Sequence, residues 1–409
     1  MAPLTRARTA AEAPTLLDTL ARAPAAAALG VAALDQLEDR KALRLAHPQL
    51  RDAVGEATTK LWVDLRVAAA VRPPTPLRWP RLEALTIRGL DAAALGVLAL
   101  ETWGALRTLR LADLPKPHLD APSARALAAA LRRMPALRVL ELWRAELRHA
   151  AAAELFRCSF VAPQLRSLRV VQGDLTPSAA RALAATGWRL EELVLLGGRS
   201  LGAAGVAALA AAPTFALREL VLKECNLDVA ALLALANAPW PLEELNLSGN
   251  DFSAAAAGPA LAALSRHAGL RKLGLSNCNL SAAGFKALVE AAWPALTCLG
   301  AQEAGVSTDG AHALGAAAFA GFPALERLAL VGVELGESGA RLLAGRRWAR
   351  LEFLNLYGGM IGAAGLAALA RGAWPALKTL RVNAGLGPLT LEDARRWAPA
   401  LEELRAGPL

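Results

Sequence analysis

The stretch Leu242-Glu-Glu-Leu-Asn-Leu-Ser-Gly-Asn-Asp-Phe252 decides how this chain of 409 residues folds. Its leucines follow the spacing LxxLxL, and the same spacing begins again at Leu190, Leu217, Leu270 and Leu351. Successive side chains of a β-strand point to opposite faces of a sheet, so leucines at alternate positions lie on one face. Each copy therefore predicts a short strand with one buried leucine face.

Weaker copies of this pattern extend over most of the chain, with an average spacing of about 27 residues, which is a period typical of repeat architectures. Such a period favours one continuous solenoid over two or three ordinary domains. The first leucines of the thirteen copies are Leu82, Leu106, Leu137, Leu165, Leu190, Leu217, Leu242, Leu270, Leu296, Leu325, Leu351, Leu377 and Leu401.

A turn and a helix are predicted after each strand. In three central copies Cys225, Asn250 or Cys278 follows the strand. A small side chain there can satisfy backbone groups of neighbouring coils, so both cysteines are interpreted as structural. The Ala- and Leu-rich runs at 202–209, 281–288 and 362–369 predict capped helices of about three turns. Eight of the ten tryptophans shortly precede a first leucine and are expected to pack helix against strand.

A unit of strand, turn and full helix with this period resembles the ribonuclease-inhibitor-like leucine-rich repeats over residues 82–406. The resemblance implies an α/β fold, a horseshoe solenoid with a parallel inner sheet and outer helices. About 12–13 repeats would occupy residues 82–409. Residues 61–81 are interpreted as a capping half-repeat and linker, and residues 1–24 as an N-terminal tail.

Residues 25–60 do not follow the period and read as short apolar helices broken by Asp35 and Pro48. This segment resembles an F-box, and its junction with the repeats is similar to that of F-box proteins carrying leucine-rich repeats. The resemblance implies apolar contacts to a Skp-type adaptor from Leu29, Val31, Leu34, Leu43, Leu45 and Leu50. Alternatively, the helices only cap the apolar end of the solenoid, and the two roles are compatible.

In each predicted strand, the residues between and just after the last two leucines face away from the core. Arginine and aromatic residues are the usual anchors of protein interfaces. We therefore predict that a protein partner binds this concave face. We also expect the protein to be a monomer outside its complex. One predicted group is Arg88, Arg110, Glu141, Trp143, Arg169, Val171, Leu196 and Lys223; a smaller one is Asn355, Tyr357, Arg381 and Asn383. The alternative is that these residues only satisfy strand propensity.

The net charge of +9 comes from 45 basic and 36 acidic residues, and the excess lies within residues 1–220. No run of Lys or Arg marks a nucleic-acid arm, so no nucleic-acid partner is expected. The uncharged stretch 200–217 contains Gly and Pro and predicts no membrane span. A cytoplasmic or nuclear location is favoured over an organelle.

The four cysteines lie far apart without a CxxC pair, so neither a metal site nor a disulfide framework is predicted. No nucleotide-binding, metalloprotease or hydrolase motif occurs, so we expect no cofactor, no catalytic residues and no enzymatic activity. The two resemblances together imply a substrate-recognition adaptor of a cullin-type (SCF) ubiquitin ligase. The alternatives are a repeat scaffold or inhibitor without a ligase link, and a regulator of a small GTPase.

Overall fold

The structure is a computed structural model that describes residues 60–64, 81–89, 95, 98–100, 102–112, 119–147, 149–156, 164–306, 314–315, 317–383 and 390–407. The N-terminal tail and residues 25–59 of the F-box-like module lie outside the described residues. The same is true of the six residues assigned to a Skp-type adaptor, Leu29, Val31, Leu34, Leu43, Leu45 and Leu50. Their role stays a prediction.

The chain divides into two compact units, and each is described by itself. The first unit contains Met1–Trp143 and Phe160–Leu165. Its described strands pair in parallel in chain order, and Thr86, Arg110 and Glu141 lie opposite one another. These elements are β1 (Lys60–Asp64), β2 (Ala84–Arg88), β3 (Thr108–Ala112), helix α6 (Ala121–Leu131) and β4 (Val139–Trp143).

The second unit contains Arg144–Ser159 and Arg166–Leu409. Ten of its strands form parallel pairs in chain order. They are β6 (Ser167–Val171), β8 (Glu192–Leu196), β9 (Glu219–Lys223), β10 (Glu244–Asn246), β11 (Lys272–Gly274), β12 (Cys298–Gly300), β13 (Arg327–Ala329), β14 (Phe353–Asn355), β15 (Thr379–Asn383) and β16 (Glu403–Gly407). A separate short pair joins β5 (Glu146–Leu147) to β7 (Asp174–Leu175).

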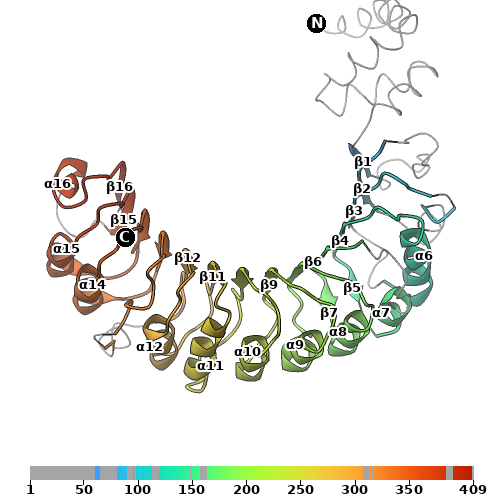
Figure 1. The fold of residues 1–409 in the computed structure, drawn as a ribbon, viewed down its shortest axis with the longest axis horizontal. Coiled ribbons are helices and arrows are strands. Elements are labelled where there is room, and N and C mark those ends of the chain that lie inside the picture. The colour runs from blue at the N-terminus through green and yellow to red at the C-terminus, as the bar shows by residue number, and fades with distance from the viewer. Residues whose placement is uncertain are drawn as a thin grey trace, which may run out of the picture. The chain divides into compact units, whose positions relative to one another are not determined.

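The helices of the second unit lie on one side of these strands (Figure 1). They are α7 (His149–Phe156), α8 (Pro177–Ala184), α9 (Gly202–Ala210), α10 (Val229–Ala236), α11 (Ala257–Ala263), α12 (Ala282–Glu290), α14 (Gly336–Ala344), α15 (Gly362–Leu369) and α16 (Leu391–Arg395), with a 3₁₀ turn at Leu264–Arg266. No helix within the described ranges is long and apolar enough to cross a membrane. The predicted parallel sheet with helices between its strands is confirmed.

One detail of the helix prediction is wrong. Ser281 caps α12 as expected, because its hydroxyl accepts a hydrogen bond from the Gly284 N–H at 3.1 Å. The helices α9 and α15 have no side-chain cap and instead begin at Gly202 and Gly362, whose φ angles are +52° and +62°. Glycine adopts this left-handed conformation without a Cβ clash, so backbone geometry replaces the capping side chain.

The leucine face of the strands forms the core. In the second unit the central leucine of each strand pairs with the next, as Leu193 does with Leu220, and Leu220 with Leu245. These three side chains are at most 1% exposed. Between them, Glu192, Glu219 and Val221 point to the other face and are half-buried. Alternation within each strand thus produces both the core and the exposed face.

The turn positions behave as predicted. Asn250 is 3% exposed, and its Oδ1 accepts hydrogen bonds from the N–H groups of Cys225 and Leu227, each at 3.0 Å. Its Nδ2 donates to the carbonyls of Leu222 at 2.8 Å and Leu247 at 2.6 Å.

The two turn cysteines are buried and make the same kind of contact. The Sγ atoms of Cys225 and Cys278 lie 3.6 and 3.3 Å from the carbonyl oxygens of Leu195 and Leu247, respectively, in the preceding coil. Burial raises the pKa of Cys225 to about 12 and that of Cys278 to about 11. Both thiols therefore stay protonated at neutral pH, as S–H donation requires. The structural interpretation of these cysteines is confirmed.

The tryptophans that precede strands in the described ranges pack as predicted, and four of them also form a hydrogen bond. Indole Nε1 donates to the carbonyl five residues earlier in Trp103, Trp293, Trp348 and Trp374, at 2.8–3.1 Å. That carbonyl belongs to the last turn of a helix for Trp293, Trp348 and Trp374, where backbone acceptors lack intrahelical donors. Trp240 differs from these four, because its buried Nε1 has no hydrogen-bond partner.

Candidate functional site

The first predicted group is divided between the two units. In the first unit, Arg110 and Glu141 are directly opposite each other on β3 and β4, and Ala112 is opposite Trp143. Glu141 is 7% exposed and accepts from both neighbours: Arg110 Nε donates to Oε2 at 2.9 Å, and Trp143 Nε1 donates to Oε1. Glu141 therefore holds an indole and a guanidinium in fixed positions on the exposed face.

Trp143 is 38% exposed and the Arg110 side chain is 51% exposed. Its hydrogen bond to Glu141 restricts the rotamer of Trp143, and tryptophan is enriched at protein interfaces, where one side of the indole is apolar and the N–H is hydrogen-bonded. Arg88 ends β2 opposite Ala112, on the same face. The sequence predicted these residues separately, and the strand register brings them together.

The second unit carries the other half of the group. Val171 on β6 is opposite Leu196 on β8, and Leu196 is opposite Lys223 on β9. Arg169 Nη2 lies 2.5 Å from Glu192 Oε1 in an ion pair. Val171 is only 8% exposed, so it contributes packing rather than accessible apolar area.

A row of three acidic residues on the second unit was not predicted from the sequence. Glu192, Glu219 and Glu244 begin β8, β9 and β10 and lie opposite one another in register. Arg169 pairs with the first of them, and Lys272 Nζ lies 2.5 Å from Oε1 of Glu244. The same alternation rule, applied two residues earlier in each of these strands, would have found this row.

Glu219 lies between the two ion pairs. Burial raises the pKa of its carboxyl group, and the charges of Glu192 and Glu244 raise it further, while Arg169 and Lys272 lower it. A raised carboxyl pKa means that the folded state binds the proton more tightly than the unfolded state does. The contribution of Glu219 to the free energy of unfolding therefore falls as the pH rises from the pKa of Glu219 in the unfolded state through its pKa in the folded state.

We expect Glu219→Gln to stabilise the protein at pH 7 by a fraction of a kcal/mol, given solvent screening at this half-exposed site. The gain should shrink as pH is lowered toward about 4, where the unfolded carboxyl group also protonates. Urea unfolding at pH 7 and pH 4 measures both effects. Glu191→Gln is the matched control. Glu191 forms an ion pair with Arg166 at 3.1 Å, so this variant should be slightly less stable than the unaltered protein at pH 7. A destabilised Glu219→Gln protein at pH 7 would contradict the prediction.

The second predicted group lies on β14 and β15. The carboxamide oxygen of Asn355 accepts from the Tyr357 N–H at 3.1 Å, and that of Asn383 accepts from the Gly358 N–H. Both asparagines are at most 9% exposed, so their role is to fix the backbone around Tyr357, which is 37% exposed. Arg381 also lies near the Phe353 ring, with its Cζ 5.4 Å from the ring centroid.

Comparison with known proteins identifies only the fold. No known family profile matches the chain, and no curated protein matches it in sequence. Among solved structures, a chain from the crystal structure of the yeast Rad7 and Elc1 complex matches with a TM-score of 0.52. The match is 14% identical and covers 98% of both chains. This chain has a leucine-rich-repeat fold.

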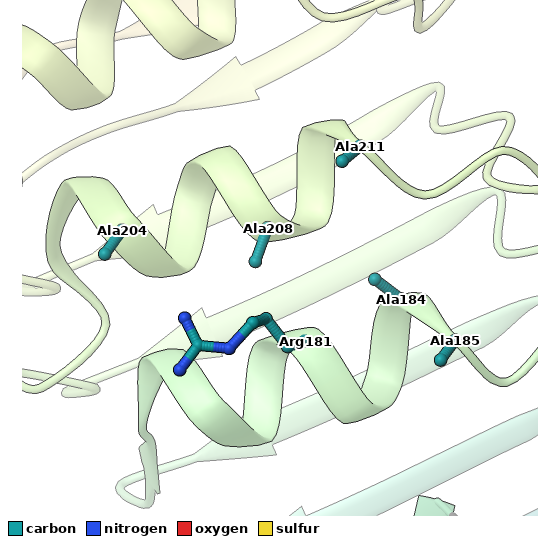
Figure 2. A pocket seen from close by; sticks show the side chains of 6 residues that line it. All are labelled: Arg181, Ala184, Ala185, Ala204, Ala208 and Ala211. Atoms are coloured by element: carbon teal, nitrogen blue, oxygen red, sulfur yellow. The ribbon is translucent and has the colours of Figure 1, made fainter.

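In the leucine-rich-repeat fold the outer helices leave grooves between them. One groove lies between α8 and α9 and is lined by Arg181, Ala184, Ala185, Ala204, Ala208 and Ala211 (Figure 2). Its lining offers one charged side chain and five methyl groups, which is too little polar chemistry to orient a small ligand. Within the described ranges, no group of three His, Cys, Asp or Glu side chains could hold a metal ion.

Proposed function

We propose that this protein is a non-enzymatic adaptor that binds a protein partner on the exposed face of its sheet. The observation that carries the proposal is the arrangement of Arg110, Glu141 and Trp143, in which one buried carboxylate fixes an exposed indole and an exposed guanidinium. Preorganised Trp and Arg side chains lose little conformational entropy on binding and are enriched among interface hot spots.

A ligase link is the finer part of the proposal. The resemblance of residues 25–60 to an F-box supports it, and the structural neighbour comes from a complex of two proteins, Rad7 and Elc1. In this role the protein would raise the effective concentration of a substrate near the ligase and supply affinity and geometry alone.

Trp143→Ala is expected to weaken binding of a captured partner by about 2 kcal/mol, or roughly 30-fold, if Trp143 is a hot spot. Glu141→Gln should have a smaller effect in the same direction, because it weakens the bonds that hold Trp143 and Arg110. The measurement is a titration of the purified partner against each variant. Leu100→Ala is the matched control, since Leu100 is a 73% exposed apolar residue of the same unit. Equal affinities for all variants would remove this surface from the proposal.

The ligase link is tested with the full-length chain and a purified Skp-type adaptor. We expect binding by the unaltered protein and loss of binding by a Leu34→Glu, Leu45→Glu double variant. As a control, circular dichroism must show that this variant has the same melting temperature as the unaltered protein, so that its repeats are still folded. If the unaltered protein does not bind the adaptor, the ligase link is wrong. The protein would then be a repeat scaffold with a different partner.

A further inference from the structure

The exposed face of β13–β15 carries an aromatic and basic patch that the proposed function does not yet use. We define the β13–β15 patch as Arg327, Phe353, Tyr357 and Arg381. Arg327 is directly opposite Phe353 in the strand register, and Asn355 is opposite Arg381. The alternate residues Leu328, Leu354 and Leu380 are fully buried, so the strand residues of the patch share the face away from the core.

The two arginines flank one aromatic ring. Arg327 Cζ lies 4.4 Å from the centroid of the Phe353 ring, and Arg381 Cζ lies 5.4 Å from it. A guanidinium that rests on an aromatic ring keeps its N–H groups available for bidentate hydrogen bonds to a carboxylate. The stacking also restricts both side chains, which lowers the entropy lost when a ligand binds.

The charges of this face are not balanced. Glu403 is the acidic group near Arg381, at 3.7 Å from its Nη2, and it also accepts from Arg405. Arg327 is exposed and makes no ion pair with any residue that the structure describes. Arg381 and Arg405 therefore share the carboxylate of Glu403, and the charge of Arg327 is not balanced by an ion pair among the described residues.

From this charge complementarity we propose that the β13–β15 patch binds an acidic segment of a partner protein, with its carboxylates on Arg327 and Arg381 and an apolar side chain between Phe353 and Tyr357. This rests on the proposed function and names the partner chemistry for one part of the face. Phe353 begins β14 and Tyr357 lies in the turn that follows this strand, so a short stretch of extended peptide can contact both side chains.

A nucleic acid is the less favoured occupant. Arg and aromatic side chains also suit phosphates and bases, but a polyanion following the sheet face would meet the acidic row of Glu192, Glu219 and Glu244 on the same unit. A short acidic peptide avoids that row because it needs only β13–β15.

Tyr357 allows a direct test because it is the single tyrosine of the chain. Full-length protein labelled with 3-fluorotyrosine gives one ¹⁹F resonance, located in the patch. The probes are a twelve-residue peptide of alternating acidic and apolar residues, the same peptide with lysine at every acidic position, and a twelve-nucleotide single-stranded RNA. We expect a saturable shift with the acidic peptide alone, and weaker binding when salt is raised from 50 to 300 mM.

Arg327→Glu with Arg381→Glu should reduce affinity for the acidic peptide at least tenfold. The matched control is Arg350→Glu with Arg371→Glu, which makes the same charge change at two exposed positions outside the patch and should change affinity less than twofold. A single Arg327→Gln variant keeps the test informative if the double variant is unstable, and it should weaken binding about threefold or more.

Three results would overturn the proposal. They are no shift with the acidic peptide, an equal shift with the basic peptide, or tighter binding of the RNA, which would identify a nucleic-acid site instead. These failures are distinguishable from failure of the proposed function. A partner that binds the unaltered protein and is lost with Trp143→Ala would preserve that function even if the acidic peptide does not bind.

Discussion

Asn250→Ala is expected to lower the free energy of unfolding by about 4 kcal/mol, because several buried polar groups lose their partners at once. The carboxamide of Asn250 satisfies the N–H groups of Cys225 and Leu227 and the carbonyls of Leu222 and Leu247. Alanine leaves all four without these bonds at a site that is 3% exposed. Water can restore few of them without opening the turn.

Chemical denaturation followed by circular dichroism measures the loss. Asn237→Ala is the matched control, since Asn237 is exposed and its carboxamide donates to a helix carbonyl, that of Leu233, at 2.8 Å. The free energy of unfolding of the Asn237→Ala variant should fall by about 1 kcal/mol or less. Similar losses for the two variants would show that the turn reorganises easily, which would refute the bridging role of Asn250.

Trp293→Ala is expected to cost about 4 kcal/mol, the range typical of a large buried aromatic side chain replaced by alanine. Trp293 is 2% exposed, and its Nε1 donates to the Leu288 carbonyl at 2.9 Å. The substitution removes both the volume that fills the space between α12 and the following strand and the hydrogen bond to the helix end.

A pair of phenylalanine variants separates these two contributions. Trp293→Phe loses some volume and the hydrogen bond, whereas Trp240→Phe loses the same volume and no bond, because the buried Nε1 of Trp240 has no partner. We expect Trp293→Phe to cost about 1 kcal/mol more than Trp240→Phe. Equal effects on the denaturation midpoint would show that the indole N–H contributes nothing.

The repeating unit could be read from the sequence because its determinants are local. The spacing of leucines within one strand places them on one face, whatever the neighbouring strands do. The turn roles of Asn250, Cys225 and Cys278 follow from the same periodicity, and the structure confirms them. The helix starts at Gly202 and Gly362 were interpreted less well, since a positive φ leaves no signal beyond the glycine itself.

The candidate sites could be read only in part. Alternation placed Glu141, Trp143 and Arg110 on the exposed face, but the sequence did not show that Glu141 binds both of the others. The register of β3 and β4 brings Arg110 opposite Glu141, and the side-chain conformations within β4 bring the Trp143 indole to the same carboxylate. Arg327 was not predicted at all, because its importance comes from the ring of Phe353 on the next strand. The F-box-like role of residues 25–60 stays a prediction from resemblance.

The sequence by itself thus determined the strand, turn and helix of each repeat and which residues face away from the core, because these depend on periodicities of a few residues. The tertiary structure decided which exposed side chains touch, how deeply Val171 is buried, and why the pKa of Glu219 is raised. Most of those properties depend on contacts between residues about 25 to 31 positions apart, which strand pairing brings together.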